Sequence, residues 1–203
     1  MTPPITCESI SSHPDFLALA SVEDLRVDLR YATAANFMGR NMYSPLDCAW
    51  AHRDAVEGLK LAMAWLARER CGAHLCVLDA LRPHSVQEAM WAALEGTPLS
   101  QYLAPPASGS IHSFGMAIDA TLVDAEGREF YMGTSFDDMA ELSHPKLEAA
   151  FLRAGVLDDE HVSNRGLLRE AMRRGGFHGI GNEWWHFDCG DRAIVRANYA
   201  RVL

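Results

Sequence analysis

One carboxylate stands inside an apolar segment of this 203-residue chain. The segment GMAIDATLV, residues 115–123, has the composition of a buried strand, yet Asp119 lies near its middle. A charged carboxylate inside a buried strand is costly unless it is paired, hydrogen-bonded or bound to a metal ion. His112 lies on the loop that leads into the same strand, and Gly115 lets the backbone turn between the two. The pattern therefore predicts a metal site that includes His112 and Asp119.

A second segment supplies the remaining candidates for this site. In EWWHFD, residues 183–188, His186 follows Glu183 by three positions. Two histidines, one carboxylate and an open position for water form a ligand set expected of catalytic zinc, and Glu183 would then be the base. A single histidine in a chain with nine of them is more often structural or solvent-exposed than a ligand. Six others compete for the role: His52, His74, His84, His144, His161 and His178.

Composition limits the partners that such a site could serve. The formal net charge is −9, and the longest run of basic residues is the pair Arg173–Arg174. These features argue against binding to nucleic acid or to an anionic membrane and favour a small molecule as the partner. No apolar stretch reaches the roughly 18 residues of a membrane span, and the first residues lack the pattern of a signal peptide, so we expect a cytoplasmic protein. Length and the 49% hydrophobic content predict one domain, residues 1–203. Five cysteines without CxxC spacing predict reduced thiols.

The periodicity of apolar residues predicts an α+β fold with an antiparallel sheet. Helices are expected over 53–70, 146–153 and 163–174, with another after Arg82 in which Ser85 and Glu88 form a capping box. Strands are expected over 74–81 and 182–190, and as a pair around the turn 125–127.

The motifs resemble those of a known family. SGSIHSFGMAID, residues 108–119, followed by EWWHFD, is similar to the S-x-H-x-x-G-x-A-x-D and E-x-x-H pair of the zinc D-alanyl-D-alanine dipeptidases of peptidase family M15, which include the vancomycin-resistance dipeptidases. The resemblance extends in the family's order over four further segments: 29–39, 78–83, 132–144 and 164–177. It implies a Hedgehog/DD-peptidase fold with a central antiparallel sheet flanked by helices.

The resemblance also assigns roles to residues. It implies one zinc ion per chain, with the ligands His112, Asp119 and His186. It implies that Glu183 is the general base and that Arg82 stabilises the transition state. Three further positions match residues that line the substrate pocket, the first two of them facing the amino end of the peptide: Tyr31, Asp137 and Ser110.

We therefore expect a zinc metallopeptidase that hydrolyses D-Ala-D-Ala or a similar small dipeptide. Three departures from the family pattern, Phe114, Met116 and Ala120, would alter the shape of the pocket and the dipeptide preferred. One alternative is a carboxypeptidase or endopeptidase acting on longer wall peptides, which the lack of an export signal disfavours. Another is a binding module without turnover, which Glu183 and Arg82 disfavour, because binding alone needs neither group. Oligomeric state and biological role, in resistance or in recycling of wall fragments, stay open.

Overall fold

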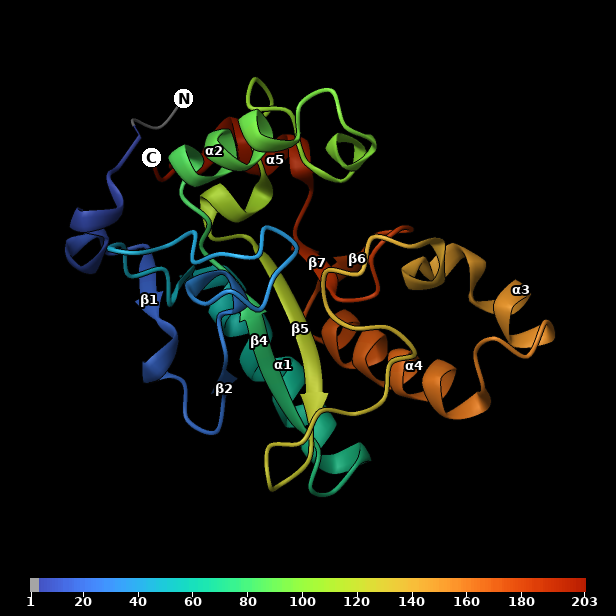
Figure 1. Ribbon diagram of the computed structural model, residues 1–203. Coiled ribbons are helices and arrows are strands. Elements are labelled where there is room, and N and C mark those ends of the chain that lie inside the picture. The colour runs from blue at the N-terminus through green and yellow to red at the C-terminus, as the bar shows by residue number, and fades with distance from the viewer. Residues whose placement is uncertain (1–3) are drawn as a thin grey trace.

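The computed structural model of the protein describes residues 4–203. Its helices and strands form a mixed α+β fold (Figure 1), as the sequence predicts. The strands are β1 (Phe16–Ala18), β2 (Arg26–Val27), β3 (Trp50–His52), β4 (His74–Asp79), β5 (Ala117–Val123), β6 (Phe177–Gly179) and β7 (His186–Cys189). The α-helices are α1 (Arg53–Glu69), α2 (His84–Leu94), α3 (Glu148–Arg153), α4 (Asp159–Arg174) and α5 (Arg192–Asn198).

The central sheet has five strands in the order β2-β4-β5-β7-β6. The pairings β4–β5, β5–β7 and β6–β7 are antiparallel, as expected, whereas β2 pairs with β4 in parallel at the edge. β1 and β3 form a separate two-stranded antiparallel sheet. The long β5 lies at the centre because β4 and β7 pair with its two edges, and all seven of its residues are buried.

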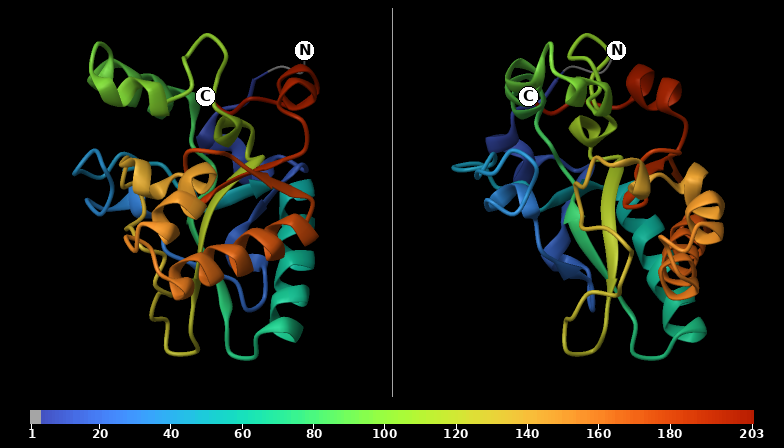
Figure 2. Two further views of the ribbon diagram at one scale, coloured as in Figure 1. Left: turned by 90° about the vertical axis from the view of Figure 1, so that its right-hand side faces the viewer. Right: turned by 45° about the vertical axis from the view of Figure 1, so that its right-hand side comes forward.

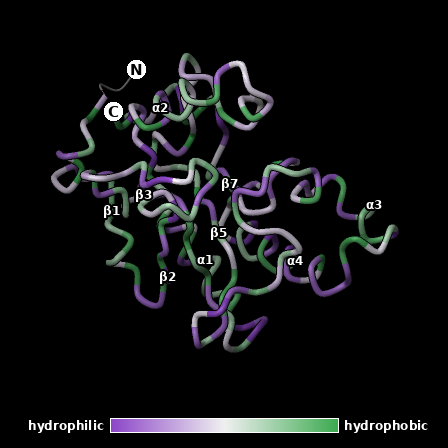
Figure 3. The backbone as a smooth tube through the Cα atoms, in the orientation of Figure 1, coloured by the Kyte–Doolittle hydropathy of each residue, from purple (hydrophilic) through white to green (hydrophobic). Residues whose placement is uncertain are grey.

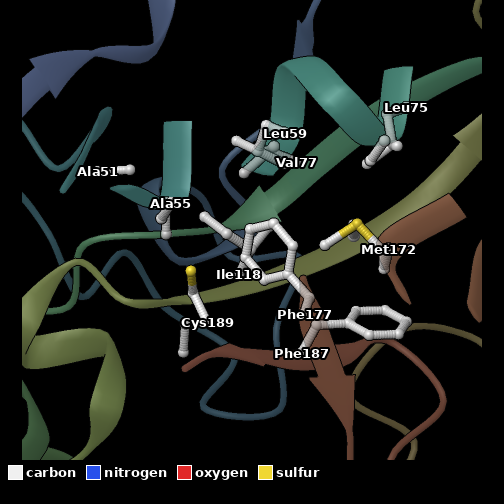
Figure 4. Close-up of a cluster of buried hydrophobic side chains, with 14 of the residues drawn as sticks. Ala51, Ala55, Leu59, Leu75, Val77, Ile118, Met172, Phe177, Phe187 and Cys189 are labelled. Carbon is white, nitrogen blue, oxygen red and sulfur yellow. The ribbon is translucent and has the colours of Figure 1, made fainter. Parts of the chain in front are cut away.

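Helices α1 and α4 pack side by side over one face of the central sheet (Figure 2). Apolar residues recur along α1 at the three- and four-residue spacing of a helix face, which includes Val56, Leu59 and Leu66. They meet Val77 of β4 and Ile118 of β5 in the main hydrophobic core. Figure 4 shows side chains from the helices and the strands converging in this core, and Figure 3 shows hydrophilic residues at the outer turns of the same elements.

The N-terminal segment supplies β2 at the edge of the central sheet, and its β1 lies beside the start of α1 (Figure 2). A second hydrophobic cluster joins this segment to α2 and includes Tyr31, Tyr43 and Met90. Because side chains alternate along a strand, the two faces of the sheet differ in composition. Polar residues of β5 and β7 therefore gather on the face that the helices leave uncovered.

Two local predictions are wrong. No capping box forms at α2, because the helix begins directly after Pro83 and Ser85 already lies inside its first turn. The strand expected after the turn 125–127 is reduced to a single bridge between Val123 and Glu129. The Asp124 side chain accepts the backbone N–H groups of Glu126 and Arg128 and so forms a compact turn, after which the chain leaves the sheet.

Other expectations hold with shifted ends. The predicted helices 53–70, 146–153 and 163–174 correspond to α1, α3 and α4. The strands predicted over 74–81 and 182–190 are shorter in the structure and correspond to β4 and β7. All five cysteines are free thiols. Within residues 4–203 no helix combines the length and the apolar composition that crossing a membrane requires.

Two helix glycines give a test of this packing. A Cβ atom at Gly58 in α1 would lie 2.5 Å from the carbonyl oxygen of Gly175 and 2.7 Å from the Phe177 ring, whereas a Cβ atom at Gly166 in α4 would meet nothing within 4 Å. Helix propensity favours alanine at both positions by about 0.5–1 kcal/mol. We expect Gly166→Ala to raise the free energy of unfolding by that amount and Gly58→Ala to lower it by about 1–3 kcal/mol, because its methyl group overpacks the core.

Urea denaturation of the two variants and the wild-type protein measures both changes. Equal stabilisation by the two substitutions would contradict the close contact of α1 with the chain after α4.

Candidate metal centre and active site

Three buried polar side chains form a row across the face of the sheet that is opposite to α1 and α4. Asp79 of β4 is the register partner of Asp119 of β5, and Asp119 is the register partner of His186 of β7. On either side of Asp119 in β5, Ile118 and Ala120 point into the main core. The alternation of β5 therefore turns Asp119 away from the helices, and strand pairing brings the other two side chains beside it.

His112 reaches the row from the loop before β5. It lies in a 3-10 turn, Ile111–Phe114, that begins where the Ser110 hydroxyl accepts the backbone N–H of His112 and ends at Gly115. Gly115 has a φ of 63°, and a Cβ atom there would lie 2.7 Å from the backbone nitrogen of His52. Glycine is thus required for the chain to turn from the His112 loop into the strand that carries Asp119, as the sequence predicts.

The ligand atoms of three residues converge. His112 Nε2 lies 3.2 Å from His186 Nδ1 and 3.3 Å from Asp119 Oδ1, and His186 Nδ1 lies 2.9 Å from Asp119 Oδ1. Neighbouring ligand atoms around a tetrahedral ion with bonds of about 2.0–2.1 Å lie about 3.3 Å apart. The three atoms therefore have the spacing of three corners of a tetrahedral metal site, and within residues 4–203 no other group of three such side chains meets in this way.

Outer hydrogen bonds fix which ring nitrogens face this centre. His112 Nδ1 lies 2.8 Å from the Ala80 carbonyl oxygen, and His186 Nε2 lies 3.1 Å from Asp188 Oδ1. Each acceptor holds a proton on the far nitrogen, which leaves His112 Nε2 and His186 Nδ1 as the lone-pair donors toward the centre. Asp188 is in turn held by Arg192, whose Nε lies 2.5 Å from Asp188 Oδ2.

The electrostatics of the centre favour a cation. Burial raises the pKa of Asp119, but His112 and His186 outweigh that effect and hold the pKa below its ordinary value. Burial lowers the pKa of His186, but hydrogen bonds to Asp119 and Asp188 outweigh it and raise the pKa to about 10. The site thus attracts positive charge strongly, and a metal ion would replace this proton because a ligating imidazole must be neutral.

Glu183 lies beside the centre in a small cavity. The residue is 9% exposed, and its carboxylate has no hydrogen-bond or ion-pair partner among the described residues. Burial raises the pKa of Glu183 above its ordinary value, which brings it closer to that of an effective general base. The cavity has a volume of about 230 Å³, below the range of about 300–1,000 Å³ usual for drug-sized ligands, so it suits a smaller molecule.

Arg82 borders the same cavity and is held rigidly. Its Nε and Nη2 lie 3.0 and 2.6 Å from Asp79 Oδ2, its Nη1 lies 3.3 Å from Gln87 Oε1, and its guanidinium lies 4.8 Å from the centre of the Tyr31 ring. The Tyr43 hydroxyl donates to the other oxygen of Asp79. The Nη2 of Arg82 also lies 3.7 Å from Asp119 Oδ2, so this fixed positive charge adjoins the candidate metal centre.

Three residues around Arg82 were not expected from the sequence: Asp79 and Gln87 accept from it directly, and Tyr43 donates to Asp79. The signal for Asp79 was present in LDALRP, residues 78–83, because Asp79 ends an apolar strand just as Asp119 interrupts one. Asp188, two residues after His186 and therefore on the same face of β7, could have been found by the same alternation. Tyr43 lies in an irregular segment, and no pattern in the sequence links it to Asp79.

Asp137 and Tyr31 lie together on another wall of the cavity. The backbone N–H of Phe37 donates to Asp137 Oδ2 at 3.3 Å, and Asp137 has a φ of 61°, a left-handed conformation that costs energy for a residue other than glycine. Burial and then the charge of Asp119 raise the pKa of Asp137 to about 8, although a hydrogen bond with Tyr31 opposes the shift. This carboxyl group would be stabilised in its ionised form by a cation in the cavity.

Some of the remaining residues singled out in the sequence line the cavity and others do not. Ser110 lines the cavity, so all eight site residues expected from the sequence border it: Tyr31, Arg82, Ser110, His112, Asp119, Asp137, Glu183 and His186. The three departures from the family pattern do not line the cavity: Phe114, Met116 and Ala120 are buried in the main hydrophobic core. Trp185 lines the cavity, whereas the Trp184 indole N–H donates to Thr134 away from it.

Comparison with known proteins identifies the family. The family model described as D-Ala-D-Ala dipeptidase, peptidase M15, matches residues 13–202. The chain belongs to the peptidase M15 family. This is a family of metallopeptidases, so the protein is an enzyme of that class.

Two relatives support this membership over most of their length. The D-alanyl-D-alanine dipeptidase of Escherichia coli (strain K12) is 38% identical over 168 residues, which cover 81% of this chain and 79% of the relative. The D-alanyl-D-alanine dipeptidase of Enterococcus faecium is 31% identical over 187 residues, which cover 82% of this chain and 86% of the relative.

A solved structure has a similar fold. The LD-carboxypeptidase LdcB matches with a TM-score of 0.51 and 13% identity, covering 94% of this chain and 80% of LdcB. At that identity the match concerns the fold alone.

Proposed function

We propose that this M15 protein is a zinc-dependent D-alanyl-D-alanine dipeptidase that acts as one catalytic domain with one zinc ion. The observation that carries the proposal is the buried meeting of His112 Nε2, His186 Nδ1 and Asp119 Oδ1 beside the unpaired carboxylate of Glu183. Two imidazoles and one carboxylate suit zinc, and three protein ligands leave an open position. The names of the two relatives supply the substrate class, D-Ala-D-Ala.

Glu183 is the proton carrier in this proposal. When bound, zinc supplies Lewis acidity, which makes water acidic near neutral pH and polarises a carbonyl group. Glu183 has no partner within residues 4–203, so its carboxylate is free to take the proton from the attacking water. It then gives the proton to the nitrogen of the leaving D-alanine. Its raised pKa makes it a stronger base for the first of these transfers.

Arg82 faces the negative charge that develops on the carbonyl oxygen. Asp79 fixes the guanidinium group of Arg82, so this group needs little movement when the negative charge appears. Burial lowers the pKa of Arg82, but Asp79 outweighs it and keeps the guanidinium charged. Arg82 therefore serves the transition state rather than the ground state of the substrate.

The amino end of the dipeptide binds at Asp137 and Tyr31. Burial raises the pKa of Asp137, whose carboxyl group has no cation in ion-pair contact among the described residues. The free ammonium group of a dipeptide supplies that cation. Ser110 lines the same cavity and contacts another part of the substrate. A cavity of about 230 Å³ with these fixed groups suits a short, free peptide.

The first functional prediction concerns Glu183. We expect the purified wild-type protein to contain one zinc per chain and to release two D-alanines from each D-Ala-D-Ala. Glu183→Gln should keep the zinc but lower kcat by about 10²- to 10⁴-fold, because it removes the proton acceptor and leaves every ligand in place. Elemental analysis and an assay for free D-alanine measure the two quantities.

His112→Ala is the matched control, because it should lose both zinc and activity. Near-normal turnover by Glu183→Gln would contradict the role of the base, and a zinc-loaded wild type without turnover would contradict the proposed activity.

The second functional prediction concerns substrate length. An N-acetylated dipeptide, or a tripeptide that ends in D-Ala-D-Ala, would leave Asp137 buried without its cation. Loss of such a pair costs about 3–5 kcal/mol, so we expect kcat/KM to fall by about 100- to 1,000-fold or more. Asp137→Asn should remove most of this discrimination, as measured by hydrolysis of the three peptides.

Asp138→Asn, which changes the exposed neighbouring carboxylate, should keep the discrimination. If the wild-type enzyme cuts all three peptides equally well, the protein is a carboxypeptidase for longer peptides instead. If Asp137→Asn retains the full preference for the free dipeptide, another group binds the amino end of the substrate.

A further inference from the structure

Three arginines line the cavity, and they differ in their partners. Arg82 is paired with Asp79, and Arg192 is paired with Asp188. Arg196 has no carboxylate within ion-pair distance among the residues that the structure describes. Its charge is therefore the one guanidinium charge of the described cavity wall that the protein leaves unbalanced.

The position of Arg196 is fixed although its charge is not compensated. Its Nη2 donates to the carbonyl oxygen of Gly109 at 3.0 Å, and this is its one hydrogen bond within residues 4–203. Its Nε is buried without a hydrogen-bond partner. The contact with Gly109 holds the guanidinium beside Ser110, which starts the 3-10 turn of His112. Nη1 has no hydrogen-bond acceptor among the described residues, and the residue lines the cavity, so this group is available to a ligand there.

The charges of the cavity are separated between different elements. Arg196 belongs to α5, which lies above the ends of β5 and β7 in Figures 1 and 2. Asp137 belongs to the segment between β5 and α3, which lies lower in both figures and contacts the chain at Phe37. The candidate metal centre is formed by the turn Ile111–Phe114, β5 and β7, and it lines the same cavity as Arg196 and Asp137. An anionic group of a ligand is thus favoured near α5 and a cationic group near Asp137.

We propose that Arg196 is a specificity-determining residue that binds the carboxylate at the C-terminal end of the peptide. This inference rests on the proposed function, because the amino end of the same dipeptide lies at Asp137. A guanidinium that keeps free N–H groups is suited to a carboxylate, with which it forms charge-assisted hydrogen bonds. A zwitterionic dipeptide then matches the cavity at both ends, and Arg196 and Asp137 together fix its length.

The experiment compares the free acid with its amide. Binding of D-Ala-D-Ala and of D-alanyl-D-alaninamide is measured by calorimetry on the zinc-loaded Glu183→Gln protein, in which turnover is suppressed, with and without a second change at Arg196. Charge-assisted hydrogen bonds contribute about 1.5–3 kcal/mol, so we expect the preference for the acid to fall by about 10- to 100-fold in Arg196→Gln. Arg196→Lys keeps the charge and should retain part of the preference.

Arg201→Gln is the matched control. Arg201 also lies next to Gly109 but does not line the cavity, so removal of its charge should leave the ratio of the two dissociation constants unchanged. The amide serves as a check of structure, because an altered pocket would weaken both ligands together. An equal loss for acid and amide in Arg196→Gln, or an unchanged ratio, would overturn the proposal.

The test of the carboxylate site at Arg196 and the test of the proposed activity can fail independently. Hydrolysis of D-Ala-D-Ala by the wild-type enzyme decides the activity. Preferential binding of the acid that depends on Arg196 would support the carboxylate site even if the wild-type enzyme did not hydrolyse the dipeptide. Failure of the acid to bind at all would overturn the carboxylate site.

Discussion

The buried carboxylate of Asp119 is the constraint on which the rest of the site depends. It lies at the centre of the sheet with 2% of its surface exposed, where an unpaired charge would cost several kcal/mol. The chain compensates it with two imidazoles, His112 and His186, whose nitrogens face the same point. An arrangement that brings three ligand atoms within 3.3 Å of one another is best satisfied by a cation between them.

Around this centre, each functional group is held by a buried partner rather than by the flexible surface. Asp79 fixes Arg82, and Asp188 fixes the ring of His186. Both supporting carboxylates stand at or next to the ends of paired strands, so the backbone of the sheet sets their positions. Such support keeps the reacting groups in place without reorganisation during the reaction. Glu183 is the exception, because its carboxylate has no partner among the described residues, and the proposed proton transfer requires such a free group.

The sequence predicted the helices, the main strands and the three residues of the candidate metal centre, because each leaves a local signal. Helix periodicity marks α1, and the isolated carboxylate in an apolar strand marks Asp119. Interactions that depend on strand register or on distant loops leave no such signal. Asp79 meets Asp119 only because β4 and β5 pair in one register, and Tyr43 meets Asp79 from a segment 36 residues away. The pocket residue Asp137 was recognised through family resemblance alone, because its approach to the cavity depends on a loop conformation that periodicity does not encode.

X-ray absorption at the zinc edge of the purified protein shows directly which atoms bind the metal. A centre built on Asp119 should give two imidazole nitrogens and oxygen ligands at about 2.0–2.2 Å, with no sulfur. Replacement of His186 by alanine should remove one imidazole from the spectrum or empty the site. A spectrum with zinc bound by thiolate sulfur, or one that His186→Ala leaves unchanged, would contradict a metal centre built on Asp119.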